Sequence, residues 1–201
     1  MSHRKWLTEQ IIGLIPHGSR VLDLGCGNGD VLSKLKSSKQ INGYGIDCNF
    51  DSILSCIKHG LNVFQGNIDE GLKEFSDGTF DYVILSQTLQ QVRRPTFVMS
   101  EMLRVGKYAI IIFPNFAYWK NRLQFMLGKS PRTPELPYHW HNTPNIRVVT
   151  INDFYSMCKK KKYVTQQIIP GNWLSKLLNR WSNFFSPVGM FVVCKESGLK
   201  Q

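Results

Sequence analysis

Three glycines at alternate positions form the stretch of this 201-residue chain that points most directly to chemistry. The segment VLDLGCGNGD, residues 21–30, places Gly25, Gly27 and Gly29 directly after a short apolar run. Glycine loops that join a strand to a helix commonly bind phosphates at the helix N-terminus. Here the next residue is Asp30, whose carboxylate would repel a phosphate, and no Gly-Lys-Ser/Thr sequence follows. The spacing therefore favours a ligand that lacks a phosphate and has a cationic part.

Two acidic residues accompany this loop. Asp23 lies in the apolar run, and Asp47 lies 24 residues later at the end of the next expected strand, where a carboxylate can accept hydrogen bonds from both ribose hydroxyls. S-Adenosylmethionine fits, because it carries a sulfonium, an ammonium and a carboxylate. The stretch VLDLGCGNG also resembles motif I of class I methyltransferases. That resemblance implies that the glycines let the backbone approach the methionine part, and that Asp23 orders the loop and the amino group.

Further cofactor contacts are expected at the ends of neighbouring strands. Class I enzymes often place an Asp after the third strand, against the adenine amine, and this chain has Asn67 there. Asn67 can accept from that amine and Ile68 can supply an apolar contact; in the alternative, Asn67 and Asp69 only cap the loop. The residues assigned to S-adenosylmethionine, or to S-adenosylhomocysteine, are Asp23, Gly25, Cys26, Gly27, Gly29, Asp47, Cys48, Asn67, Ile68 and Ser86.

The segment expected to lie beside a methyl acceptor contains no residue that could take a proton. The end of the fourth strand reads LSQTLQQV, residues 85–92, and contains no acid, no histidine and no NPPY-type clamp for a flipped base. A general base assists methyl transfer to an acceptor that carries a proton, and glutamine cannot act as one. We expect Gln87, Gln91 and Trp119 to form any acceptor pocket, and we assign no catalytic residue.

No metal site is expected. His139 and His141 could ligate a metal, but the sequence offers no evident third ligand, and Trp140 between them indicates loop packing. The five cysteines are scattered and include no CxxC pair, which argues against a zinc site and against a disulfide framework.

The elements that must position these residues alternate between strands and helices. Short apolar runs rich in β-branched and aromatic residues predict strands, and stretches with helical spacing predict helices. Strands are expected at 20–26, 41–47, 61–67, 80–86 and 108–114, and helices at 30–38, 51–60, 70–75 and 94–106. This alternation implies right-handed crossovers and a mostly parallel sheet with helices on both faces. The sequence therefore predicts an α/β, Rossmann-like fold, which we interpret as one domain over residues 1–201.

After Pro114 the alternation breaks. Residues 115–128 predict an amphipathic helix with Trp119, Leu123 and Met126 at helical spacing. Residues 129–145 contain four prolines and predict a long, ordered, lid-like loop. The later elements expected are a helix at 150–160 capped by Thr150 or Asn152, an amphipathic aromatic insertion at 171–187, and a final antiparallel strand pair at 163–169 and 188–195.

Composition narrows the function classes. The chain is 42% hydrophobic and 19% charged, which is ordinary for a globular protein, and no stretch approaches the roughly 20 apolar residues of a membrane span. The N-terminal IIGLI is too short for a signal peptide, so we expect a cytoplasmic protein with reduced thiols. The whole net charge of +11 comes from residues 101–201. Such asymmetry indicates an acidic partner, nucleic acid or a membrane surface, or only a solvated face such as KKKK at 159–162.

A more specific resemblance comes from four segments read together. YVILSQTLQQVRRP, EMLRVGKYAIIIFPNFAYWKNRLQ, LPYHWHNTPNI and TINDF resemble the methionine biosynthesis protein MetW family, over about residues 18–170. The resemblance implies a class I methyltransferase-like fold and association with homoserine O-acyltransferase (MetX) in methionine biosynthesis.

Three functions stay open on the sequence. The first is an accessory protein that binds the acyltransferase and senses S-adenosylmethionine, with the aromatic face at 171–187 or the helix at 118–128 as docking surface. The second is a small-molecule methyltransferase whose acceptor pocket includes Gln87, Gln91, Trp119 or the 129–145 loop. The third is an RNA methyltransferase, which only the basic C-terminal half suggests, since no basic-aromatic recognition module accompanies it.

Overall fold

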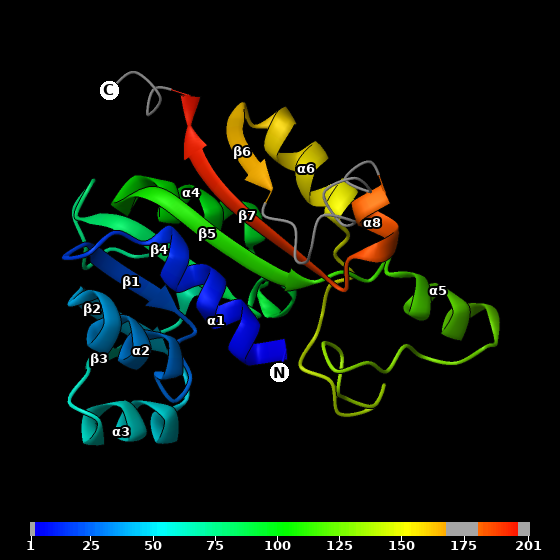
Figure 1. Cartoon of the computed structure of the whole chain (residues 1–201), viewed down its shortest axis with the longest axis horizontal. Helices are drawn as coiled ribbons and strands as arrows, with labels where there is room; N and C mark the ends of the chain where they lie inside the picture. The colour runs from blue at the N-terminus through cyan, green and yellow to red at the C-terminus, as the bar shows by residue number, and fades with distance from the viewer. Residues whose placement is uncertain (1–2, 168–180, 197–201) are drawn as a thin grey trace. The chain divides into compact units, whose positions relative to one another are not determined.

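The computed structural model describes residues 3–167 and 181–196, and the chain divides into two compact units (Figure 1). The first unit comprises Met1–Ser86 and Arg94–Ile110, and the second comprises Gln87–Arg93 and Ile111–Gln201. The strands are β1 (Arg20–Leu24), β2 (Asn42–Asp47), β3 (Asn62–Gln65), β4 (Phe80–Ser86), β5 (Gly106–Pro114), β6 (Tyr163–Gln167) and β7 (Val188–Lys195). Their order in the sheet is β3-β2-β1-β4-β5-β7-β6, which confirms the predicted α/β class.

The helices follow the expected alternation. They are α1 (His3–Leu14), α2 (Asp30–Lys39), α3 (Phe50–Lys58), α4 (Pro95–Val105), α5 (Trp119–Met126), α6 (Ile151–Lys160) and α8 (Ser182–Phe185), with 3-10 turns η1 (Ile68–Glu70) and η2 (Leu89–Gln91). Within the two described ranges, no helix combines the length and apolar character that crossing a membrane requires.

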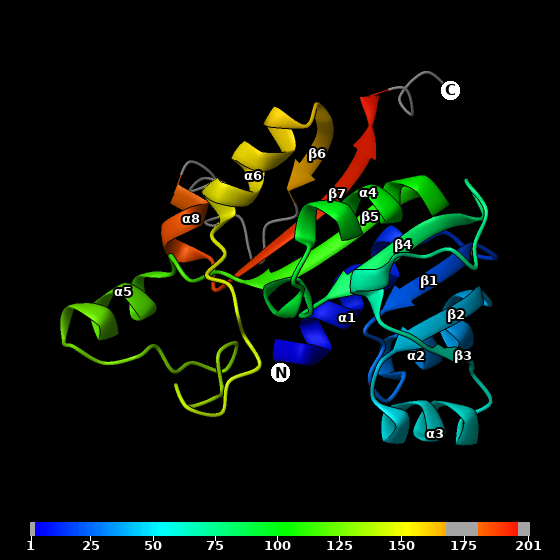
Figure 2. The ribbon, with the colours of Figure 1, turned by 180° about the vertical axis from the view of Figure 1, so that it is seen from behind.

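The first unit aligns the strand ends that carry the candidate residues. β1 pairs in parallel with β2 and with β4, so that Leu24 lies opposite both Ile46 and Leu85. The carboxyl ends of these strands therefore meet at one edge of the sheet, next to the loops that follow them. Figure 2 shows α2 and α3 beside β2 and β3, and α1 completes this layer by burying Leu7 and Ile11.

The second unit is built around β7 and α6. β7 runs antiparallel to β6, as the C-terminal pattern predicts, and α6 lies against β6. Three rings fill the core: Phe154 lies 5.0 Å from Phe113 and 4.7 Å from Phe191, measured between ring centroids. Thr150 caps α6 by accepting a hydrogen bond from the backbone N–H of Asp153 at 3.1 Å, which decides between the two predicted caps.

Two helix predictions differ from the structure. Residues 71–75 are not helical, because Gly71 takes a φ of +98° directly after the single 3-10 turn η1. The helix expected over 115–128 is shorter, and its apolar side chains are exposed while Asn121 is buried. Of the insertion at 171–187, residues 171–180 lie outside the described residues, and α8 occupies part of the remainder.

Candidate cofactor-binding site

The glycine loop connects the end of β1 with the start of α2. Gly25, Gly27 and Gly29 have φ angles of 70°, 53° and 79°, in the left-handed region that glycine enters without strain. A side chain at Gly29 would also collide, since its Cβ would lie 2.3 Å from Leu61 Cδ1 and 2.9 Å from Cys56 Sγ. Beside Gly27, no described heavy atom other than those of Gly27 and its two chain neighbours lies within 4 Å of the equivalent point. The backbone conformation therefore requires the alternate glycines, and the middle one is open to a ligand.

The carboxylate of Asp47 fastens this loop to the end of β2. Its Oδ2 accepts a hydrogen bond from the N–H of Gly27 at 2.8 Å, and its Oδ1 accepts one from the N–H of Asn49 at 2.8 Å. The carbonyl of Ile46 accepts a third from the N–H of Gly25 at 2.7 Å. Each carboxylate oxygen can accept more than one hydrogen bond, so Asp47 keeps capacity for ribose hydroxyls. The residue thus couples the shape of the loop to the expected ribose position.

Asp23 lies within β1 and is only 2% exposed. Burial raises the pKa of its carboxyl to about 7, and the negative charge of Asp47 adds to this effect. A buried carboxylate is stabilised when a positive group is placed beside it. The pair of acids therefore fits a ligand with an ammonium or sulfonium group, as S-adenosylmethionine has.

The two cysteines assigned to the site differ in exposure. Cys26 is buried, and its sulfur packs on β2, where a Cβ on Gly45 would lie 2.7 Å from it. Burial raises the pKa of the Cys26 thiol above its ordinary value, so the side chain is a neutral packing group. Cys48 is exposed directly after Asp47, and its carbonyl accepts a hydrogen bond from Gln65 Nε2 at 3.4 Å. Of the two, only Cys48 has a side chain accessible to a ligand.

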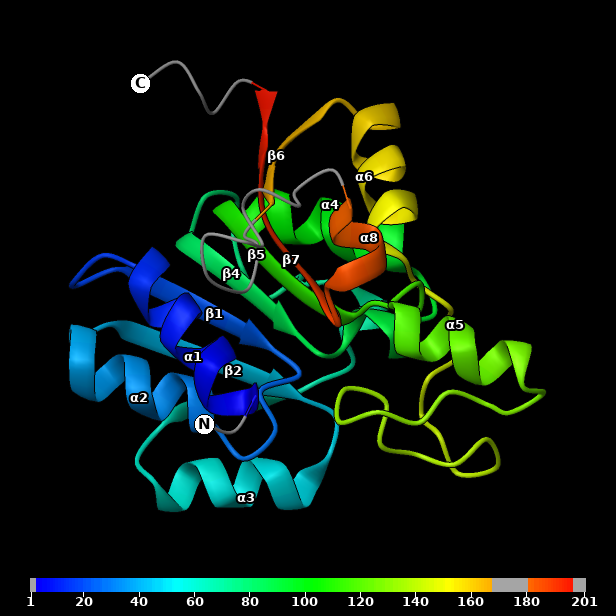
Figure 3. The same cartoon turned by 45° about the vertical axis from the view of Figure 1, so that its right-hand side comes forward.

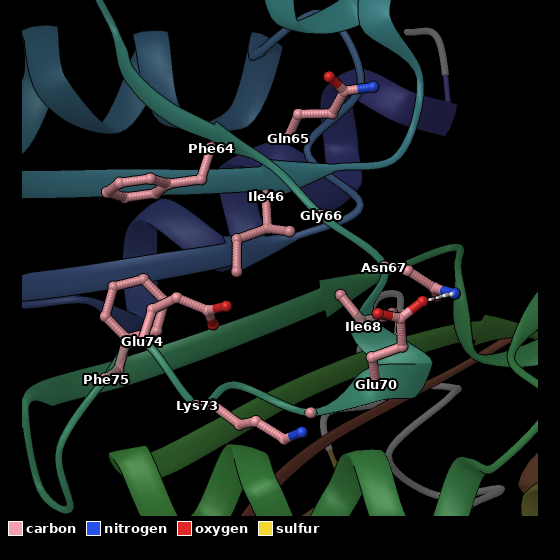
Figure 4. A pocket seen from close by; sticks show the side chains of 11 residues that line it. Ile46, Phe64, Gln65, Gly66, Asn67, Ile68, Glu70, Lys73, Glu74 and Phe75 are labelled. Atoms are coloured by element: carbon pink, nitrogen blue, oxygen red, sulfur yellow. Dashed lines mark hydrogen bonds between the residues drawn. The ribbon is translucent and has the colours of Figure 1, made fainter.

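Asn67 and Ile68 line a pocket of about 400 Å³ in the first unit (Figure 4). The Asn67 amide is engaged at both ends: its Oδ1 accepts from the N–H of Asp69 at 3.1 Å, and its Nδ2 donates to Glu70 Oε1 at 3.2 Å. These bonds are the capping role that the sequence left open. The Oδ1 atom accepts one hydrogen bond here and has a second lone pair that can accept from an adenine amine. Other residues that line the pocket are Ile46, Phe64, Lys73, Glu74 and Phe75.

Ser86 and the candidate acceptor residues belong to different units. Ser86 ends β4 in the first unit, whereas Gln87 begins the second with a φ of +58°, which is uncommon for a non-glycine residue. The carbonyl of Gln87 accepts hydrogen bonds from Gln90 Nε2 at 2.7 Å and from Gln91 Nε2 at 3.3 Å. Among the contacts described for the second unit, none joins Trp119 to either Gln87 or Gln91. The structure therefore brings the two glutamines together, and Trp119 is 37% exposed at the start of α5.

His139 and His141 pack on each other. Their rings stack with centroids 5.6 Å apart and planes 15° apart, and the Trp140 ring meets His141 edge-on. Across residues 3–167 and 181–196, no group of three His, Cys, Asp or Glu side chains is placed to hold a metal ion.

Sequence reasoning does not predict a network of two buried asparagines, Asn115 before α5 and Asn121 within it, which anchors this helix by hydrogen bonds. Asn115 Nδ2 donates to the carbonyls of Asn183 and Ser186 at 2.9 and 2.8 Å, and Asn121 Nδ2 donates to the carbonyl of Asn115 at 3.0 Å. Both asparagines are buried. The only signal for them is their presence in the segment FPNFAYWKNRLQ, which carries the family resemblance but not the role of each residue.

A second unpredicted network holds the segment that follows η1. Glu101 Oε2 accepts from the N–H of Leu72 at 2.9 Å, and Arg104 donates to the carbonyls of Leu72 and Phe75 at 2.9 Å each. The Arg104 side chain also lowers the pKa of the Glu101 carboxyl to about 2. In the sequence Glu101 and Arg104 have the i, i+3 spacing of an ordinary surface ion pair on a helix. This spacing gives no sign that both side chains also bind the backbone of residues 72–75.

Comparison with known proteins identifies the family. The family model described as "Methionine biosynthesis protein MetW" matches residues 6–193. The chain belongs to the MetW family. A bifunctional methionine biosynthesis protein, MetXA/MetW from Rhodopirellula baltica, is 43% identical over 155 residues, which are 72% of this chain and 25% of that protein. Family membership confirms the resemblance read from the motifs and supports a role in methionine biosynthesis.

Two further relatives and several similar solved structures are named as methyltransferases. Demethylmenaquinone methyltransferase from Bacillus licheniformis is 32% identical over 114 residues, 52% of this chain and 48% of that protein. The chain therefore spans between a quarter and half of these two curated relatives. SAM-dependent methyltransferases from Thermotoga maritima and Archaeoglobus fulgidus superpose with TM-scores of 0.66 and 0.61, each at 19% identity, covering 97% and 96% of this chain and 91% and 94% of theirs. This MetW-family chain has the class I methyltransferase fold.

Proposed function

We propose that this MetW-family chain binds S-adenosylmethionine and supports or regulates a homoserine O-acyltransferase of the MetX type. The observation that carries the acyltransferase part is the Rhodopirellula baltica relative, whose name joins MetXA and MetW in one protein. Joining two components in one chain raises their effective concentration for each other, which favours components that act together. The same association between separate molecules is what we expect for this chain.

The cofactor part of the proposal is supported by the geometry of the first unit. The left-handed glycine loop is open at Gly27, Asp47 fastens it, and the buried Asp23 carboxyl is suited to a cationic group. In enzymes of this fold S-adenosylmethionine supplies an activated methyl group. In a sensor, only its occupancy matters. The described glutamines can orient a ligand but cannot remove its proton, which favours the sensor.

Acyltransferase activity is the direct test of this proposal. Homoserine O-acyltransferase from the same organism is assayed with and without the chain, at several S-adenosylmethionine concentrations. We expect activity to rise when the chain is added and to respond to the cofactor. An unchanged activity, together with no complex on gel filtration, would reject the accessory role.

Cofactor binding is tested separately by calorimetry on Asp47→Ala. We expect severely weakened binding of S-adenosylmethionine, because this change removes the ribose acceptor and releases the N–H of Gly27. Asp51→Ala is the matched control, since Asp51 is an exposed carboxylate in the first turn of α3. Equal affinity of the wild type and Asp47→Ala would reject this site.

The second candidate function is methyl transfer to a small molecule. It is favoured by the methyltransferase relatives, which match about half of the chain. Transfer of labelled methyl from S-adenosylmethionine to a component of a cell metabolite extract would support it. Cofactor binding without any labelled product would support the sensor instead.

A further inference from the structure

An exposed apolar surface lies on α5 and the segment after it in the second unit. We call it the α5 surface and define it by Leu123, Phe125, Met126, Leu127, Trp140 and Val148, all of which are exposed, Met126 by 83% and Trp140 by 77%. Figures 1 and 3 show the chain after α5 turning back and running beneath that helix. Scattered exposed apolar residues are ordinary, but Phe125, Trp140 and Val148 line one hollow together, and such a grouping marks an interaction site.

The α5 surface contains two adjoining hollows that differ in character. One has a volume of about 280 Å³ and is lined by Phe125, Tyr138 and Trp140 among others. The other has a volume of about 470 Å³ and adds Lys129 and Arg132 to the shared Tyr138 and Trp140. A partner that fills both would place an apolar side chain in the first hollow and an acidic side chain in the second.

An unsatisfied acceptor lies in the wall of the apolar hollow. Asn145 lines it, and the Oδ1 atom of Asn145 is buried without a hydrogen-bond partner among the described residues. Buried polar atoms are nearly always hydrogen-bonded in folded proteins. Because this atom is not exposed in the free chain, an N–H or O–H of a partner would reach it only after the Asn145 side chain turned toward the hollow.

The charge around the α5 surface selects its partner. Residues 115–150 carry five basic residues and one acidic residue, which favours a partner with acidic side chains. A second copy of the chain would oppose two basic rims. A flat bilayer would not fill the hollows, although anionic lipid would share the charge preference.

We propose that the α5 surface is the docking site for the acyltransferase, which presents an acidic residue beside a protruding apolar side chain. The identity of the occupant rests on the proposed function and on the fused relative. The cofactor-binding residues and the docking residues then belong to different units, so each can be altered alone.

The test measures binding of purified homoserine O-acyltransferase to the wild type and to single variants. We expect Trp140→Ala to raise the Kd at least about 30-fold, as expected for an interface anchor, and Arg132→Glu to weaken binding most at low salt. Phe125→Ala is paired with Tyr155→Ala on α6, because both aromatic residues are 53% exposed. We expect only the first of these two to weaken binding. S-Adenosylmethionine affinity should be unchanged in every variant.

The outcomes separate this proposal from the proposed function. Wild-type binding that Trp140→Ala leaves unchanged would overturn the docking site and leave the accessory role standing. No binding by the wild type would overturn both. Binding of the chain to vesicles of anionic lipid that depends on Trp140, without acyltransferase binding, would assign the surface to a membrane instead.

Discussion

The glycine loop of the first unit and α5 of the second are both visible as patterns in the sequence, yet the patterns have different causes. In the loop, alternate glycines satisfy backbone angles and a close approach to Cys56 and Leu61. In α5, apolar residues at helical spacing point to solvent, while the polar Asn121 is buried. Glycines at fixed positions therefore predict the backbone conformation directly. Apolar residues at helical spacing predict a helix, but they do not show whether the apolar face packs against the same chain or against a partner.

The largest expected effect concerns Asp23 and the pH dependence of stability. Its pKa is about 7 in the folded chain and near 3.8 when unfolded, so the folded state binds one more proton between these values. The free energy of unfolding should therefore fall as the pH rises from about 4 to 7, by up to about 4 kcal/mol from this group. We expect Asp23→Asn to remove this fall and to weaken S-adenosylmethionine binding.

Urea unfolding of the cofactor-free chain at pH 5 and pH 8 measures this effect. The variant should gain stability relative to the wild type at the higher pH and lose cofactor affinity at both. If the two proteins showed the same pH dependence, the Asp23 carboxyl would be ionised and solvated in the folded chain, and the cationic-ligand argument would lose its support.

Gly29→Ala and Gly128→Ala compare the two regions directly. Both glycines have positive φ angles, 79° and 70°, but only at Gly29 would a Cβ meet other atoms within 4 Å among the described residues. We expect Gly29→Ala to cost about 3 kcal/mol, from strain and overpacking together, and Gly128→Ala to cost about 1 kcal/mol from strain alone. Chemical denaturation of both variants checks this, and equal losses would show that crowding at Gly29 is relieved by movement of Leu61.

Glu101→Gln tests the network that the sequence does not reveal. The change keeps the shape of the side chain but removes the charge that pairs with Arg104, so we expect a loss of about 1 kcal/mol at neutral pH. Because the pKa of Glu101 is lowered to about 2, its contribution in the wild type should be lost as the pH falls from about 4.5 to 2. Thermal unfolding at pH 7 and pH 3 measures both, with Asp81→Asn at the exposed Arg20 pair as control.

The sequence predicted the fold more completely than the site, for a physical reason. Strand and helix periods are local, so all five strands expected before Pro114 and the capped helix at 150–160 are found. The short helix expected at 70–75 does not form. The positive φ of Gly71 ends the turn, and Arg104, about 30 residues away in the sequence, binds the carbonyl of Leu72. For the same reason the candidate cofactor residues can be predicted from their places at the ends of strands. The hydrogen bond from Asn67 to Glu70 cannot, because it depends on the geometry of the folded turn.

The smallest expected effect belongs to Leu123. It tests whether the exposed apolar residues of α5 or its buried Asn121 hold the helix in place. Leu123→Ala should change the free energy of unfolding by at most about 0.5 kcal/mol, because the side chain is already exposed. Asn121→Ala should cost about 1 kcal/mol, because it removes the hydrogen bond to the carbonyl of Asn115. Urea denaturation of both variants decides which residue holds the helix. A larger loss for Leu123 would mean that α5 is covered by another part of the chain in solution, and the α5 surface would then not be available to a partner.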